Sequence, residues 1–319
     1  MIIEHPPRHA AALDRYLQRG MVFSELEQAI ILAVAYADVF DYPLTIREIR
    51  RYLPGVAASE EQVAAALLAP GLGPQTLARV GDMVMLAGRE AIVATRRRRA
   101  AVADRLWPAA VRYGRMIGRL PFVRMVAVTG ALAVNNVEPD ADIDYLVITE
   151  TGRLWLCRAG IIGLVRLVAK RGPILCPNYL LSERALRLDE HSLYSAHELA
   201  QMIPLAGMAW YERMRLANPW ADELLPNAGG MPYLVTPQPS GRPLTQALAE
   251  LALRSRAGGW LERWEMERKV RKFSARDQGN PEINLTSDCC KAHYGSHRQR
   301  TLSSFAERLR SIDPAGAQG

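Results

Sequence analysis

The stretch that decides the fold reads PFVRMVAVTGALAVNNVEPDADIDYLVITETG and covers residues 121–152. Residues 123–129 form a short run rich in β-branched side chains, which is typical of a buried strand. Gly130 then permits a tight backbone turn, and the ALAVNN segment predicts a short helix whose free N–H groups face a ligand. After a loop, residues 142–149 (DIDYLVIT) predict a second strand.

Two carboxylates enter this second strand together. Side chains at positions i and i+2 of a strand point to the same face, so Asp142 and Asp144 are expected to project side by side. Neighbouring carboxylates repel each other unless a cation neutralises them, and hard oxygen ligands suit Mg²⁺, with Mn²⁺ as the alternative. An anion-binding turn at Gly130 and Ala131 beside such a pair is what metal-assisted phosphoryl or nucleotidyl transfer requires. The alternative is two solvated residues at a loop edge.

The order of these residues resembles the signature of the DNA polymerase β-like nucleotidyltransferase superfamily. In that signature an apolar residue, Gly, and Ser or Gly are followed, after a spacer, by Asp, an apolar residue, and Asp or Glu. This chain supplies residues 129–131 (TGA) and then residues 142–145 (DIDY). The chain is also similar to a group of uncharacterised bacterial nucleotidyltransferase-domain proteins through residues 176–183 (CPNYLLSE), 193–207 (LYSAHELAQMIPLAG) and 217–220 (ANPW).

The resemblance implies a fold and an activity. It implies an α+β protein whose nucleotidyltransferase core, residues 89–228, is a mixed β-sheet with flanking helices. It also implies transfer of a nucleoside monophosphate from a nucleoside triphosphate to an acceptor hydroxyl. Asp142 and Asp144 would be the catalytic and metal-binding residues. The acceptor, whether a small molecule, a sugar, RNA or a protein side chain, is not specified by the sequence.

Two departures from the family pattern bear on activity. Ala131 stands where the family usually has a Ser whose hydroxyl helps to hold a phosphate. Backbone N–H groups at Gly130 and Ala131 can still bind phosphate, but a lost hydrogen bond to a charged group costs about 1.5–3 kcal/mol. Active members also carry a third carboxylate on a later strand, which often acts as general base.

The matching strand in this chain is predicted at residues 174–183. It offers Asn178 and Ser182 on one face, with Glu183 at its end and no Asp in the middle. Asn178 could take the third place as a neutral oxygen ligand near the nucleotide, and Glu183 is a possible substitute. Without that carboxylate the chemistry slows or passes to another group. A catalytically impaired binding protein with the same fold is therefore the alternative function.

His197 is a further candidate for nucleotide binding. It lies on a helix predicted after Ser192, where Tyr194, His197 and Gln201 share one polar face at helical spacing. The ring is expected either to contact substrate in the cleft or to form a hydrogen bond within the interface between helix and sheet.

Residues 22–88 predict three helices followed by a β-hairpin, which is the order of a winged-helix module. Ser24, Thr45 and Ser59 are the expected N-caps, and the hairpin turn is expected at residues 81–82. The helix after Ser59 occupies the recognition position, yet its VAAALLAP face has almost no side chains that read bases. A structural or interaction module is therefore favoured, and a DNA-binding regulator is kept as a less favoured alternative.

The remaining segments are predicted to be mostly helical. A long helix over residues 90–119 carries four arginines at 96–99, either as a solvated or interdomain face or as a polyphosphate contact. Residues 229–312 predict a helical C-terminal segment that covers the core, with one helix over 245–272, a short strand INL and a final helix. The CCKAHYGSH stretch could suggest zinc, but adjacent cysteines strain tetrahedral ligation.

Composition and charge restrict the expected class of protein and the kinds of partner it binds. The chain has 319 residues, is 49% hydrophobic and carries a formal net charge of +7, so it suits a globular protein with polyanionic partners such as nucleotides. Four cysteines without framework spacing argue against a disulfide scaffold.

Residues 154–170 are apolar, but Arg158 and Arg166 indicate a buried amphipathic helix rather than a membrane span. Without a signal-peptide pattern at residues 1–11, a cytoplasmic location is expected.

Overall fold

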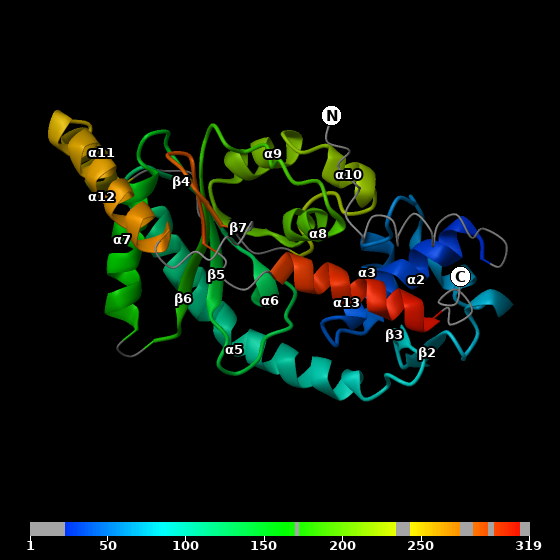
Figure 1. Cartoon of the computed structure of the whole chain (residues 1–319). Coiled ribbons are helices and arrows are strands. Elements are labelled where there is room, and N and C mark those ends of the chain that lie inside the picture. The colour runs from blue at the N-terminus through cyan, green and yellow to red at the C-terminus, as the bar shows by residue number, and fades with distance from the viewer. Residues whose placement is uncertain (1–22, 170–171, 234–242, 275–282, 293–296, 313–319) are drawn as a thin grey trace, which may run out of the picture.

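The structure is a computed structural model that describes residues 23–169, 172–233, 243–274, 283–292 and 297–312 (Figure 1). It confirms a mixed α+β protein with two open sheets and flanking helices. The smaller sheet has three antiparallel strands in the order β1-β3-β2. The larger sheet is mixed and has six strands in the order β7-β4-β5-β6-β9-β8.

The N-terminal part contains the expected helices and hairpin. The helices α2 (Glu25–Asp38), α3 (Ile46–Arg51) and α4 (Glu60–Ala66) each begin after a residue that forms a capping box, as predicted. The short 3₁₀ turn η1 (Pro70–Leu72) leads into the hairpin of β2 (Leu77–Val80) and β3 (Met83–Leu86). Strand β1 (Leu44–Thr45) pairs with β3 at the edge of this hairpin.

The long helix α5 (Ile92–Gly118) joins the two sheets, and part of its arginine run lies between them (Figure 1). Arg96 donates to the carboxylate of Glu48 on α3 at 2.8 and 2.9 Å. Arg99 donates to Glu138 at 2.6 Å and to the backbone carbonyl of Phe40 at 2.8 Å. These two arginines therefore form the expected interdomain face, whereas Arg97 and Arg98 are exposed.

The larger sheet is built around residues 121–152, the stretch quoted at the start of the sequence analysis. Strand β4 (Val123–Val128) lies antiparallel to both β5 (Ile143–Thr149) and β7 (Ile203–Ala206). Strand β5 runs parallel to β6 (Leu175–Ser182), and helix α7 (Leu154–Val168) makes the crossover that parallel strands require. The short helix α6 (Gly130–Ala133) connects β4 to β5, and α8 (Leu193–Gln201) precedes β7. Helices α9 (Met208–Leu216) and α10 (Trp220–Leu224) follow β7.

The C-terminal segment departs from the prediction in two ways. The single helix expected over 245–272 is wrong, because the chain breaks into α11 (Leu244–Leu253) and α12 (Arg256–Ser274). A Cβ atom at Gly258 would lie 1.9 Å from the carbonyl oxygen of Leu253, so only glycine fits this tight break. The predicted strand INL is confirmed as β8 (Ile283–Leu285), but a second strand that was not predicted, β9 (Cys289–Ala292), pairs with it, and both extend the large sheet before α13 (His297–Ile312).

Some predictions fall outside the described residues. From the sequence we also expect a loose leader or short helix over residues 1–20, a proline-rich linker over 231–244 and a disordered tail after Asp313, and these lie wholly or mostly outside the described residues. His293 of the CCKAHYGSH stretch is also outside them. Cys289 and Cys290 occupy adjacent positions of β9, so they belong to opposite faces of the sheet, and each packs into a different hydrophobic cluster.

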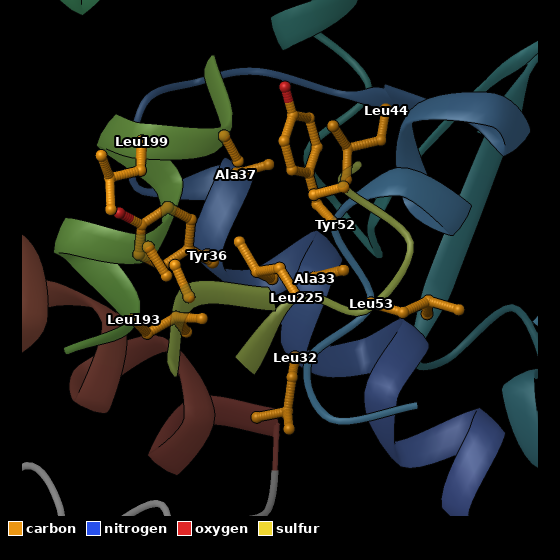
Figure 2. Packing of buried hydrophobic residues seen from close by; sticks show 14 of the residues in the cluster. Leu32, Ala33, Tyr36, Ala37, Leu44, Tyr52, Leu53, Leu193, Leu199 and Leu225 are labelled. Carbon is orange, nitrogen blue, oxygen red and sulfur yellow. The ribbon is translucent and has the colours of Figure 1, made fainter. Parts of the chain in front are cut away.

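Alternation along the strands produces two hydrophobic cores. In β4, Met125 and Ala127 join one cluster, whereas Val126 and Val128 join the other. The first cluster continues from the sheet into the N-terminal helices: Figure 2 shows Leu32 and Tyr36 of α2 packed among Leu193, Leu199 and Leu225. The predicted boundary near residue 88 therefore does not separate two independent cores. Among the described helices, none combines the length and apolar character needed to cross a bilayer.

Candidate metal and substrate site

A glycine turn sits directly against the second carboxylate. Gly130 has φ +65°, a left-handed conformation that side chains disfavour. A Cβ atom at this position would lie 2.7 Å from Asp144 Oδ2. The chain enters the turn from β4, where the amide of Thr129 donates to the backbone carbonyl of Asp144 at 3.1 Å. Both the conformation and the close approach therefore require glycine here.

Strand pairing gathers three ligand-bearing side chains at one place. Asp144 is the register partner of Cys176 on the parallel strand β6, and Asp142 precedes it by two residues. One ligand atom from each of Asp142, Asp144 and Cys176 lies within 4.8 Å of the others, and all three residues are partly exposed. The two carboxylates therefore lie together, as the Asp-x-Asp spacing predicts. Cys176 is an addition that the sequence did not single out.

The local electrostatics disfavour further negative charge. Burial, followed by the neighbouring charges of Asp142 and Glu198, raises the pKa of Asp144 to about 7, although a hydrogen bond with Cys176 opposes the rise. Burial and the two aspartates also raise the pKa of the Cys176 thiol. A cation placed among these groups would favour their ionised forms. The donor set and the lack of a neutralising basic side chain in the cluster fit a divalent cation.

The cluster opens into a large cavity of about 990 Å³. One wall is the glycine turn and the strand ends of the large sheet, and the opposite wall comes from α2, α3 and α8. The six residues that the sequence proposed for metal, phosphate and nucleotide binding line this cavity: Gly130, Ala131, Asp142, Asp144, Asn178 and His197. Their shared location is an observation, whereas their roles in catalysis and binding remain predictions.

Glu183 does not substitute for a third carboxylate. It does not line the cavity, and its carboxylate lies 3.7 Å from Arg124 Nε, in an ion-pair cluster with Glu150 and Glu250. Ser182, on the face proposed for Asn178, is buried and donates to Asp288 instead. The first half of β6 thus presents Cys176 and Asn178 to the cavity, where the register between β6 and β5 shifts.

His197 is packed in an interface and also lines the cavity. Its ring stacks on Tyr36 with centroids 4.0 Å apart and is only 4% exposed. Nδ1 lies 3.3 Å from Gln201 Nε2, and Nε2 has no hydrogen-bond partner among the described residues. Burial lowers the pKa of His197 to about 3, so the ring is neutral at physiological pH. It can contact a ligand through a ring N–H or lone pair, but not as a cation.

Glu198 is a cavity carboxylate to which the sequence gave no role. Burial raises its pKa, Lys291 opposes the rise, and its charge acts on Asp144. Its place in the cavity depends on how α8 packs against the sheet, which local sequence does not encode.

Comparison of the chain with protein-family models, characterised proteins and solved structures finds no match. The site's chemistry is therefore argued from its geometry.

Proposed function

We propose that the protein is a nucleotidyltransferase that moves a nucleoside monophosphate from a nucleoside triphosphate to an acceptor hydroxyl. The observation that carries this proposal is the meeting of Asp142, Asp144 and the Gly130 turn inside one large cavity. Mg²⁺ or Mn²⁺ at the carboxylates would supply positive charge that stabilises the transferring phosphoryl group.

Side chains and backbone N–H groups of the chain would bind the cation and the nucleotide and accept the proton. Asp142 and Asp144 hold the cation, and the backbone N–H groups at Gly130 and Ala131 face the phosphates. Asn178 offers a neutral amide on the same wall. Glu198 is a further cavity carboxylate whose charge acts on Asp144, and its raised pKa suits a group that accepts the proton of the attacking hydroxyl.

The arrangement of elements supports this proposal further. A buried strand, a glycine turn, a short helix and a second strand beginning after Asp142 follow the nucleotidyltransferase pattern. The N-terminal helices and hairpin follow the order of a winged helix. Residues of α2 and α3 line the cavity, which supports a structural role for this module more than DNA binding. The exposed start of α4 carries Glu60 and Glu61, which would repel phosphates.

The test is metal-dependent binding of labelled nucleoside triphosphates to the full chain, followed by an assay for pyrophosphate release. Asp142→Asn and Asp144→Asn should each abolish the metal-dependent part of the binding. Asp140→Asn is the matched control, because Asp140 is exposed in the preceding loop and does not line the cavity. Unchanged metal-dependent binding in Asp142→Asn would refute the site.

The second candidate is a catalytically impaired protein that binds nucleotides with the same fold. The observation that favours it is the first half of β6, where Cys176 and Asn178 stand in place of a carboxylate. Metal-dependent triphosphate binding without pyrophosphate release, tested across small alcohols, sugars, RNA and protein acceptors, would select this candidate. A salt-dependent shift of duplex DNA would instead point to the DNA-binding regulator.

A further inference from the structure

The position of Cys176 differs from that of every other cysteine in the chain. All four cysteines lie in the described residues and are free, but Cys157, Cys289 and Cys290 are buried, and only Cys176 is partly exposed. The Cys157 thiol donates to the carbonyl of Pro121, away from the cavity. The Cys176 sulfur instead lies within 4.8 Å of a carboxylate oxygen of both Asp142 and Asp144.

The three side chains form a compact set on one side of a strand pair. Parallel pairing of β5 and β6 fixes Cys176 beside Asp144, and Asp142 lies directly before the start of β5. Their ligand atoms all lie within 4.8 Å of one another. The opposite side of the set opens into the cavity, which leaves room for water or a substrate oxygen.

A second feature of the same cavity indicates a bound ligand. His197 is 4% exposed and lines the cavity, and its Nε2 has no hydrogen-bond partner among the described residues. A buried polar atom normally has a partner, and leaving it without one costs about 1–3 kcal/mol. The lining of the cavity therefore includes a buried polar atom that is left for a ligand to satisfy.

Ligand chemistry then distinguishes among cations. Mg²⁺ prefers hard oxygen ligands in octahedral geometry, whereas thiolates favour Zn²⁺ and other softer cations. Three protein ligands with one open position is the composition of catalytic zinc sites. We propose that Cys176 is the third protein ligand of the cation held by Asp142 and Asp144, and that the site prefers a cation of the Zn²⁺ class over Mg²⁺. This inference rests on the proposed function only in taking the aspartate pair as a cation site.

The test uses the full chain after treatment with a chelator. Cd²⁺ and Co²⁺ are titrated as spectroscopic substitutes for Zn²⁺, and Zn²⁺ affinity is measured by competition with a chromophoric chelator. The wild-type chain should develop a sulfur-to-metal charge-transfer band that saturates at one cation per chain. Cys176→Ser should lose the band and weaken Zn²⁺ binding by at least about tenfold, the loss typical even of outer-sphere partners.

Cys176→Asp provides the complementary variant, because it replaces the thiol by the hard oxygen ligand that Mg²⁺ prefers. It should also lose the charge-transfer band, and its preference should shift toward Mg²⁺. Circular dichroism checks that both variants fold, and each retains the other three cysteines as an internal control for adventitious thiol binding.

The outcomes separate this inference from the proposed function. Cd²⁺ binding without a sulfur band in the wild-type chain, or an unchanged band in Cys176→Ser, would overturn the role of Cys176. Asp142-dependent triphosphate binding could still be intact in that case. Conversely, a Cys176-dependent band in a chain that binds no triphosphate would support the metal site and refute the nucleotidyltransferase.

Discussion

At the scale of single residues, the site depends on a glycine that makes room for a carboxylate. Asp144 lies so close to the Gly130 turn that a methyl group there would strike Oδ2 at 2.7 Å. The carboxylate is also largely buried, and its pKa of about 7 shows how strongly this place disfavours an uncompensated negative charge. Gly130 therefore leaves room for the Asp144 carboxylate, and the charge of that carboxylate would be stabilised by a bound cation.

Replacing this glycine should damage both stability and binding. Gly130→Ala places a side chain at φ +65°, which costs about 1–2 kcal/mol, and the clash with Asp144 adds to that cost. The free energy of unfolding should fall, and metal-dependent triphosphate binding should be lost. Gly152→Ala is the control, because Gly152 has φ +70° with no atom within 4 Å of the added Cβ. Equal effects of the two substitutions on binding would contradict this account.

The neutral state of His197 predicts a pH dependence of stability. Its pKa is about 3 in the folded chain against an ordinary value of 6.5. Between these values the unfolded chain binds a proton that the folded chain does not, so stability is complete above pH 6.5 and declines as the pH falls toward 3. Each pH unit removes up to about 1.4 kcal/mol.

The variant His197→Phe keeps a ring against Tyr36 and removes this titration. Urea unfolding at pH 6.5 and pH 5 should show that wild-type stability falls by about 2 kcal/mol more than that of the variant. Parallel profiles for the two proteins would mean that His197 gains its proton in the folded state as readily as in the unfolded state.

At the scale of elements, the sequence correctly predicted the features that depend only on neighbouring residues, such as helix caps and strand alternation. The N-caps at Ser24, Thr45 and Ser59 and the apolar runs of β4 and β5 are confirmed, because capping and strand alternation act over a few residues. The same holds for the Asp-x-Asp pair, whose common face follows from the strand period alone.

Features that depend on distant partners were missed. Strand β7 contains Pro204, which argues against a central strand, yet β7 lies at the sheet edge, where proline is tolerated. Cys176 joins the aspartates only through the register between β5 and β6, which no local pattern specifies. The break between α11 and α12 follows the contact of Gly258 with Leu253, whereas the sequence there reads as one continuous helix.

Helix α12 also supplies the N-terminal cap of helix α7. Arg153 provides no side-chain cap for α7, and Glu262 of α12 accepts hydrogen bonds from the amides of Trp155 and Leu156 at 2.9 and 2.8 Å. Glu262→Ala should destabilise the fold by about 1–3 kcal/mol for each unsatisfied donor. Chemical denaturation measures the change, and Glu267→Ala, at an exposed position of the same helix, is the control. A loss no larger than that of the control would show that water replaces the carboxylate.

At the scale of the whole molecule, α2 connects the N-terminal part to everything around it. Its residues from Gln28 to Asp38 are all buried, as expected for a helix packed on every side. The Asp38 carboxylate is paired with Arg89 at 2.8 Å and with Arg308 of α13 at 2.7 Å, and α13 lies beside α2 in Figure 1. Since α2 also lines the cavity, the N-terminal part contributes side chains to the cavity as well as to the shared core.

This integration predicts that residues 22–88 and the remainder of the chain unfold together. Leu32→Ala, at a side chain of α2 that is 1% exposed, should lower the free energy of unfolding by about 2–5 kcal/mol. All six tryptophans lie outside residues 22–88, so tryptophan fluorescence reports only on the remainder. Its urea midpoint should move down together with the far-ultraviolet circular dichroism midpoint. Leu68→Ala, at an 81% exposed side chain, should leave both midpoints nearly unchanged. If the fluorescence midpoint stays fixed in Leu32→Ala while circular dichroism is lost earlier, the N-terminal part unfolds separately and cannot be a permanent wall of the cavity.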